Sequence, residues 1–151
     1  MKEAKEAQNG AEEYSIDDFR SEIEEAIAEN SRLEEDDPRF HNDLIGIDTQ
    51  LLTESDRNLF AMSKKLLGFA EKDPVLVDKG QYKRLYSDFL DQLKKVAEEI
   101  NETKTDRDMT EAYRDTDEYW SRTFLRSYVI NVTTVPTMNM NSELETLEGK
   151  K

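Results

Sequence analysis

The spacing of the apolar side chains constrains the fold of this chain more than any other feature of its sequence. Between residues 40 and 69 they recur every three or four positions, and the mean interval of about 3.6 is the period of a nearly straight α-helix. The same spacing returns between residues 82 and 100. The sequence therefore predicts two long helices, over 40–70 and 81–100, packed as an antiparallel, coiled-coil-like hairpin. The positions of these stripes are Phe40, Leu44, Ile47, Leu51, Ser55, Leu59, Met62, Leu66 and Phe69, then Tyr82, Tyr86, Phe89, Leu93, Val96 and Ile100.

Two further helices are expected to cover this hairpin. Ser15 is typical of an N-cap, and apolar residues follow it at helical spacing, which predicts a helix over 15–30. Another helix is predicted over 107–127. The first long stripe is also wide, which indicates that its helix meets more than one neighbour. The residues that widen it are Ile45, Leu52, Phe60 and Leu67, and the inward positions expected of the last helix are Met109, Ala112, Tyr113, Trp120, Phe124 and Tyr128.

The stretch SYVINVTTVPTMNMN, residues 127–141, differs from the rest of the chain because it is uncharged and partly β-branched. Tyr128, Ile130 and Val132 alternate with their neighbours in the period-two pattern of a strand with one drier face. We therefore expect a β-strand over 128–135. Three arrangements are open: pairing with the short VLV run at 75–77, pairing with another copy or a different protein, or an unpaired extended tail over the helices.

These patterns predict a mainly α protein, a bundle of about four helices with a C-terminal β-strand or extended tail. We expect a disordered acidic arm at 1–14, one helical domain with its terminal strand at 15–135, and a flexible tail at 136–151.

The charge of the chain restricts its partners. Its formal net charge is −14, and residues 1–40, with fourteen acidic and five basic side chains, contribute −9 of it. A field of this sign opposes binding to nucleic acid or to an anionic membrane, and it favours basic protein partners. The chain has no cysteine and no apolar run long enough to span a membrane, so a cytoplasmic location is expected, in a host cell if the protein is viral.

Signals for catalysis and for cofactors are weak. His41 is the single histidine, and no acid–base partner stands at a suitable helical spacing from it. The acidic pairs Asp106/Asp108 and Asp115/Asp117 lack the further oxygen ligands and the glycine of a calcium loop. We expect no enzyme activity, no cofactor and no metal site. A carboxylate-based metal protein or enzyme remains a minor alternative.

The basic residues of the last predicted helix do not indicate a nucleic-acid interface. Four arginines fall within one band of that helix, but acidic residues interleave with them, and a mixed-sign face suits a protein better than a phosphate backbone. The arginines are Arg107, Arg114, Arg122 and Arg126.

Two protein-binding functions follow from these features. The favoured one is a small acidic adaptor, scaffold or oligomeric subunit that acts through its helical faces and its terminal strand. The residues expected at this partner or oligomer interface are Tyr128, Ile130, Val132 and Val135, with Trp120 and Phe124 as anchors. The alternative is an inhibitor that imitates DNA phosphates through the acidic residues of helix 15–30, for which Glu22, Glu25 and Glu29 are the candidates.

The order of these elements resembles that of the small terminase subunits of some tailed phages. The resemblance covers roughly residues 40–147 and rests on a helical hairpin, a short β segment and an acidic tail. It implies a non-enzymatic ring protein of viral assembly. This chain lacks a recognisable DNA-binding helix-turn-helix, and no functional residue carries over.

Overall fold

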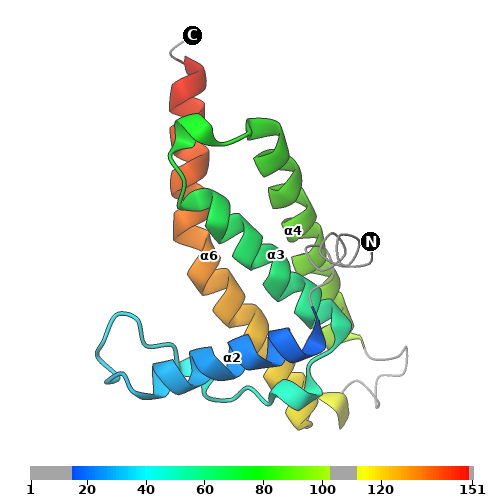
Figure 1. Ribbon diagram of the computed structural model, residues 1–151. Coiled ribbons are helices and arrows are strands. Elements are labelled where there is room, and N and C mark those ends of the chain that lie inside the picture. Colours follow the sequence, from blue (N-terminus) through cyan, green and yellow to red (C-terminus); the bar gives the residue numbers. More distant parts are fainter. Residues whose placement is uncertain (1–14, 103–111, 150–151) are drawn as a thin grey trace, which may run out of the picture.

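The computed structural model describes residues 15–102 and 112–149, and within these ranges the chain is mainly helical and contains no strand (Figure 1). Its α-helices are α2 (Ile16–Ser31), α3 (Glu54–Ala70), α4 (Lys79–Asn101) and α6 (Asp117–Gly149). Three 3₁₀ helices lie in the connections: η1 (Asn42–Leu44), η2 (Thr49–Leu51) and η3 (Pro74–Leu76).

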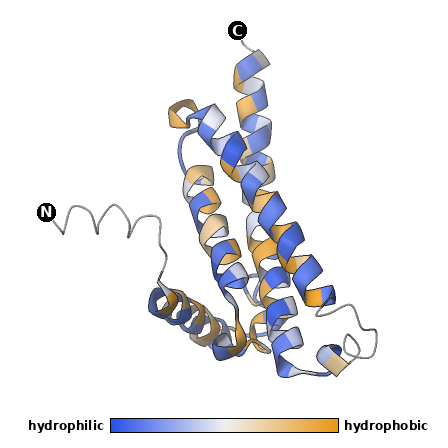
Figure 2. Ribbon diagram, turned by 90° about the vertical axis from the view of Figure 1, so that its right-hand side faces the viewer, coloured by the Kyte–Doolittle hydropathy of each residue, from blue (hydrophilic) through white to orange (hydrophobic). Residues whose placement is uncertain are grey.

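Helices α3, α4 and α6 lie side by side, and α2 crosses one end of them (Figure 1). Helices α3 and α4 form the predicted antiparallel hairpin, and each of them also packs against α6. Apolar and polar residues mix along every helix, as expected where each helix buries one face (Figure 2). The buried core consists of Phe19, Ile23, Leu44, Ile47, Leu59, Phe60, Leu66, Val77, Tyr82, Phe89, Val96, Ile100, Leu125, Val129, Met140 and Leu144.

Side-chain caps determine where the helices begin. The side chains of Ser15 and Asp78 accept hydrogen bonds from backbone N–H groups in the first turns of α2 and α4. Helix α3 begins with a capping box, in which the Thr53 hydroxyl accepts from the Asp56 N–H and the Asp56 carboxylate accepts from the Thr53 N–H. The N-cap predicted at Ser15 is therefore confirmed.

The single helix predicted over 40–70 is wrong in its first half, because α3 begins only at Glu54. The Asp48 side chain caps η2 instead, which turns the chain before the capping box starts α3. The backbone of Gly46 also passes against the ring of Phe124, where a Cβ atom would lie 2.1 Å from a ring carbon. The apolar positions of this segment still reach the core through two short turns.

The strand predicted over 128–135 is also wrong, because α6 runs through it without interruption. The expected flexible tail continues the same helix as far as Gly149, and within it Met140 and Leu144 are buried. The helix predicted over 107–127 is not continuous in its described part, because a turn at residues 115–116 separates a helical segment at 112–114 from α6, which starts at Asp117. The predicted arm at 1–14 and the residues Arg107 and Met109 lie outside the described residues.

Packing explains why the uncharged stretch is helical. The residues that α6 buries recur at helical spacing, so β-branched side chains face α3 and α4 rather than a partner strand. Two of these residues are threonines whose hydroxyls donate to carbonyls one turn earlier, Thr133 to Val129 and Thr137 to Thr133. Pro136 lies within the helix, where it removes one backbone N–H. The buried side of α6 is formed by Ser121, Arg122, Leu125, Val129, Thr133, Thr137, Met140 and Leu144.

Candidate functional site

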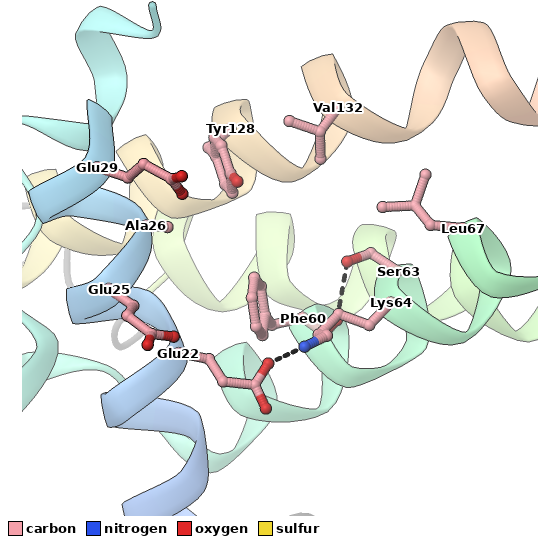
Figure 3. A pocket seen from close by; sticks show the side chains of 10 residues that line it. All are labelled: Glu22, Glu25, Ala26, Glu29, Phe60, Ser63, Lys64, Leu67, Tyr128 and Val132. Atoms are coloured by element: carbon pink, nitrogen blue, oxygen red, sulfur yellow. Dashed lines mark hydrogen bonds and ion pairs between the residues drawn. The ribbon is translucent and has the colours of Figure 1, made fainter. Parts of the chain in front are cut away.

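An open groove of about 520 Å³ lies where α2 crosses α3 and α6. We call it the acidic groove. Three glutamates of α2 form one wall, a face of α3 forms the opposite side, and two side chains of α6 close one end (Figure 3). Its lining residues are Glu22, Glu25, Ala26 and Glu29 of α2, Phe60, Ser63, Lys64 and Leu67 of α3, and Tyr128 and Val132 of α6.

The three glutamates share one face of α2 because their spacing of three and four residues is helical. Glu22 forms an ion pair with Lys64 across the groove, and the Lys64 ammonium lies 5.8 Å from the centre of the Phe60 ring. Glu25 and Glu29 are exposed and form no ion pair with another described residue. The groove therefore holds two carboxylates that no ion pair with a described residue neutralises, although the charge of Glu29 also acts on Arg39.

Tyr128 links this groove to the loop before α3. Its ring meets that of His41 edge to face at 5.4 Å, and burial, with the nearby charges of Asp43 and Glu29, raises the pKa of its phenol. The phenol is therefore protonated at neutral pH. His41 is held by its backbone, which exchanges hydrogen bonds with the side chain of Asn30. These contacts give His41 a packing role.

The interface residues predicted on α6 do not lie on one surface. Tyr128 and Val132 face the acidic groove, whereas Val135 is 62% exposed and Ile130 is 37% exposed. Trp120 is 46% exposed and stacks at a tilt on Phe124, whose ring packs against Gly46. At helical pitch Tyr128, Val132 and Val135 lie on one side of α6, whereas Ile130 lies on another, so the predicted strand interface is not kept as one surface.

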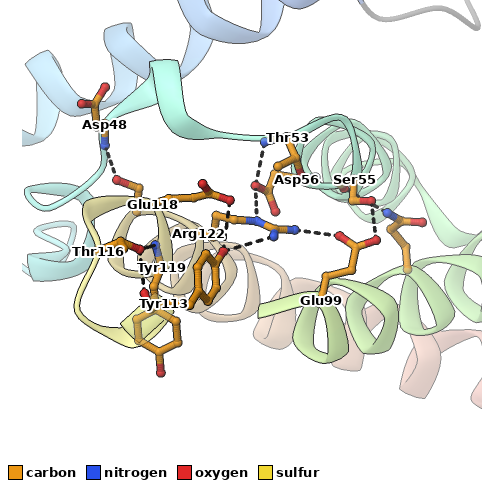
Figure 4. A network of polar contacts seen from close by, with 12 residues as sticks. Asp48, Thr53, Ser55, Asp56, Glu99, Tyr113, Thr116, Glu118, Tyr119 and Arg122 are labelled. Carbon is orange, nitrogen blue, oxygen red and sulfur yellow. Dashed lines mark hydrogen bonds and ion pairs between the residues drawn. The ribbon is translucent and has the colours of Figure 1, made fainter. Parts of the chain in front are cut away.

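A buried polar network joins the start of α3, the end of α4 and the start of α6 (Figure 4). The guanidinium of Arg122 donates to the Asp56 carboxylate at 2.8 Å and to Glu99 at 2.7 Å. The Glu99 carboxylate also accepts from the hydroxyl of Ser55 at 2.9 Å, and the Tyr113 hydroxyl lies 3.4 Å from the guanidinium. This network therefore fixes three helices to one another at one end of the bundle.

The charges of this network are coupled. Burial raises the pKa of the Asp56 carboxyl, and the charge of Arg122 and hydrogen bonds from Thr53 offset part of that rise. Burial alone would lower the pKa of Arg122, but the charge and hydrogen bonds of its partners, Asp56 first, raise it above the ordinary arginine value. The guanidinium is therefore charged at every accessible pH, and the network joins buried charges of opposite sign.

The titratable side chains of the described residues do not gather into a metal site. No cluster of three or more histidine, cysteine, aspartate or glutamate side chains in residues 15–102 and 112–149 is arranged to hold a metal ion. Asp115 and Asp117 are exposed, and Asp106 and Asp108 lie outside the described residues. Because Arg122 is buried among carboxylates, the arginine band of the last helix does not form a common surface.

Sequence reasoning missed two features. The contribution of α3 to the acidic groove was visible only indirectly, because Phe60 and Leu67 widened the apolar stripe without indicating what they met. The pair of Arg122 with Asp56 joins residues 66 positions apart, and no local pattern indicates it.

Comparisons with known proteins add no relative. No protein-family model, curated protein or solved structure matches this chain. None of the described helices is both long and apolar enough to cross a membrane. The layout shared with small terminase subunits depended on a β segment at 128–135, which is helical, so that resemblance carries no further argument.

Proposed function

We propose that this chain is a non-enzymatic interaction protein, an adaptor that binds a basic amphipathic segment of a partner protein in the acidic groove. One observation carries the proposal: Glu25 and Glu29, which form no ion pair with another described residue, line the same groove as the apolar side chains of Leu67 and Val132. A segment with lysine or arginine on one side and apolar residues on the other would neutralise the two glutamates and cover the two apolar side chains.

The acidic groove also has a charge that a partner could displace. Lys64 holds Glu22 by an ion pair that is partly exposed to water, so its net stabilisation is small. A lysine or arginine of the partner could replace Lys64 beside Glu22 without leaving a buried charge unpaired. The groove would then offer three carboxylates to the partner.

The inhibitor that imitates DNA is the second candidate, because it would use the same three glutamates. It differs in one requirement: a DNA-binding surface would contact the carboxylates and would gain nothing from the apolar side of the groove. The dependence of binding on Leu67 therefore distinguishes the two functions.

The test is a fluorescence titration with a synthetic amphipathic helical peptide that carries a lysine face and a leucine face. The variant E25Q/E29Q is expected to weaken binding at least about fivefold, because two charges opposite the lysine face are lost. The matched control is E34Q/E35Q, which removes two exposed carboxylates beyond the end of α2 and should leave the affinity within about twofold.

A second part of the test uses the variant L67A. Its affinity for the peptide is expected to fall severalfold, because the substitution removes apolar contact area from the groove. Equal weakening by E25Q/E29Q and E34Q/E35Q would reject the groove as the site. Loss of affinity with E25Q/E29Q but none with L67A would favour the inhibitor that imitates DNA, and a basic DNA-binding domain would then be the probe to use.

A further inference from the structure

The side of α6 that closes the acidic groove continues beyond the groove as one row of side chains. Their intervals of three and four residues place them on the same side of the helix. The first two line the acidic groove and are partly buried, whereas the third, Val135, is 62% exposed. The row therefore extends the apolar side of the groove to a side chain that the described residues leave largely uncovered. We call it the α6 row, and it consists of Tyr128, Val132, Val135, Asn139, Glu143 and Thr146.

The α6 row ends in a second hollow, of about 310 Å³, which we call the far hollow. It lies at η3, which follows α3 in the chain and packs against α6 at the end of the bundle opposite to α2 (Figure 1). Val75 in this hollow is 69% exposed, so the far hollow also offers an apolar side chain to a partner. The lining residues are Asp73, Pro74, Val75, Glu143, Thr146 and Leu147.

Both ends of the α6 row are acidic. Glu25 and Glu29 line the acidic groove at one end, and Asp73 and Glu143 line the far hollow at the other. Asp73 and Glu143 are exposed and, like the two glutamates of α2, form no ion pair with another described residue. The side chains of the row between the two ends carry no charge. The order along the row is therefore acidic, uncharged and acidic.

The length of the α6 row sets the size of an occupant. Its first and last residues are eighteen positions apart, which corresponds to about 27 Å along a helix. A helix of similar length beside α6 would reach from the glutamates of α2 to Val75 in the far hollow. Helices α3, α4 and α6 already lie side by side, so such a helix would take the place of a fourth member of the bundle.

We propose that the partner segment in the acidic groove is a helix of about 18 residues that lies along the α6 row, with basic side chains in its first and last turns and apolar side chains between them. This inference rests on the proposed function and adds to it the length of the partner segment and the order of its charges. Lysine or arginine at each end would meet carboxylates, and the apolar side chains would cover Leu67 and Val135.

The order of charges excludes a second copy of this chain as the source of the helix. None of the described helices α2, α3, α4 and α6 has a basic side chain in its last turn. Three of them, α2, α3 and α6, carry acidic side chains in the first turn, which the carboxylates at either end of the row would repel. The partner helix therefore belongs to a different protein.

The test is a fluorescence titration of the full chain with two labelled helical peptides of 18 residues and equal composition. One peptide carries lysines in its first and last turns and leucines between them, and the other carries leucines at both ends and lysines in the middle. The first is expected to bind at least about tenfold more tightly, because only its charges meet both pairs of carboxylates. Equal affinities would overturn the inference, because charge alone would then account for binding.

A variant at the far hollow tests the path of the helix. D73N/E143Q is expected to weaken the first peptide at least about threefold, because it removes two charges opposite its second basic end. Asparagine at position 73 can still cap η3. The matched control is D88N/E98Q, which removes two exposed carboxylates of α4 and should leave the affinity within about twofold.

A variant in the middle of the α6 row tests the apolar contact. V135S removes an exposed apolar side chain without adding charge, so it should weaken the first peptide severalfold. Weakening by D73N/E143Q no greater than by D88N/E98Q, or no effect of V135S, would overturn the inference. If E25Q/E29Q still weakened binding in that case, the proposed function would stand without this path. If E25Q/E29Q had no effect either, the proposed function would fail as well.

Discussion

Removal of Arg122 should destabilise the fold strongly, because it leaves a buried carboxylate without its counter-charge. The Asp56 side chain is fully buried and that of Arg122 is 5% exposed, so water cannot replace the lost partner. Breaking one side of a buried ion pair costs about 3–5 kcal/mol. The contact with Glu99 adds little because that side chain is 36% exposed. We therefore expect R122M to lower the free energy of unfolding by about 3–5 kcal/mol at neutral pH.

The assay is urea unfolding followed by circular dichroism. With a typical denaturant dependence of about 2 kcal/mol per molar urea, the midpoint should fall by roughly 2 M. The double variant R122M/D56N should lose less free energy of unfolding than the sum of the losses in its two single variants, because it no longer contains an unpaired buried charge. The same substitution at an exposed pair, R39M, is the control, and it should leave the midpoint unchanged.

The cost of R122M should also depend on pH. Without the guanidinium, the pKa of Asp56 rises further above its unfolded value, so the folded variant takes up a proton more readily than the unfolded chain. The variant should therefore recover stability relative to the native chain as the pH falls through the folded pKa of Asp56. A loss of about 1 kcal/mol or less at neutral pH, or a loss independent of pH, would refute this account of the network.

Three further predictions test the packing. Burial raises the pKa of Tyr82 to about 12 from the ordinary 10.0, so the free energy of unfolding should fall between pH 10 and pH 12, because the unfolded chain releases this proton first. Y82F should reduce this slope in alkaline urea titrations, and the raised pKa of Tyr128 should leave part of it. G46A should destabilise the chain by about 1–3 kcal/mol in urea unfolding because the new methyl overlaps the Phe124 ring, and F124A should reduce that penalty. V129D should abolish cooperative thermal unfolding, because Val129 is fully buried, whereas V135D should melt like the native chain. A larger loss of thermal stability in V135D than in V129D would contradict the orientation of α6.

The amphipathic helices were predictable because local signals and tertiary contacts agree. Helix α4 follows the stripe from Tyr82 to Ile100, and helix α2 begins at the predicted cap, Ser15. Helix α3 was predicted too long because the apolar spacing continues through 40–53, where two short turns place the same residues in the core. Spacing alone does not distinguish a helix from a loop that buries residues at similar intervals.

The strand was predicted in error because α6 buries small polar residues. Thr133 and Thr137 occupy the buried side of the helix, and their hydroxyls are satisfied by carbonyls one turn earlier. Counted as polar, they interrupt the helical stripe and leave only the period-two alternation visible. Counted as residues that can be buried, they continue the helical spacing from Leu125 to Leu144.

The candidate site was predicted in separate pieces. Glu22, Glu25 and Glu29 were chosen for their charge and Tyr128 and Val132 for a strand, and only the crossing of α2 over α3 and α6 brings them together. Helix crossing depends on contacts between residues far apart in the sequence, which a single sequence does not indicate.

The most direct test of the proposed function is a nuclear magnetic resonance titration of the full chain with the lysine–leucine peptide. The account predicts that resonances of Lys64, Leu67 and Val132 shift together with those of Glu25 and Glu29, and that added salt reverses the shifts. Shifts spread evenly over the acidic surface, or confined to the acidic run at 34–37, would contradict it, because the peptide would then be bound by charge alone.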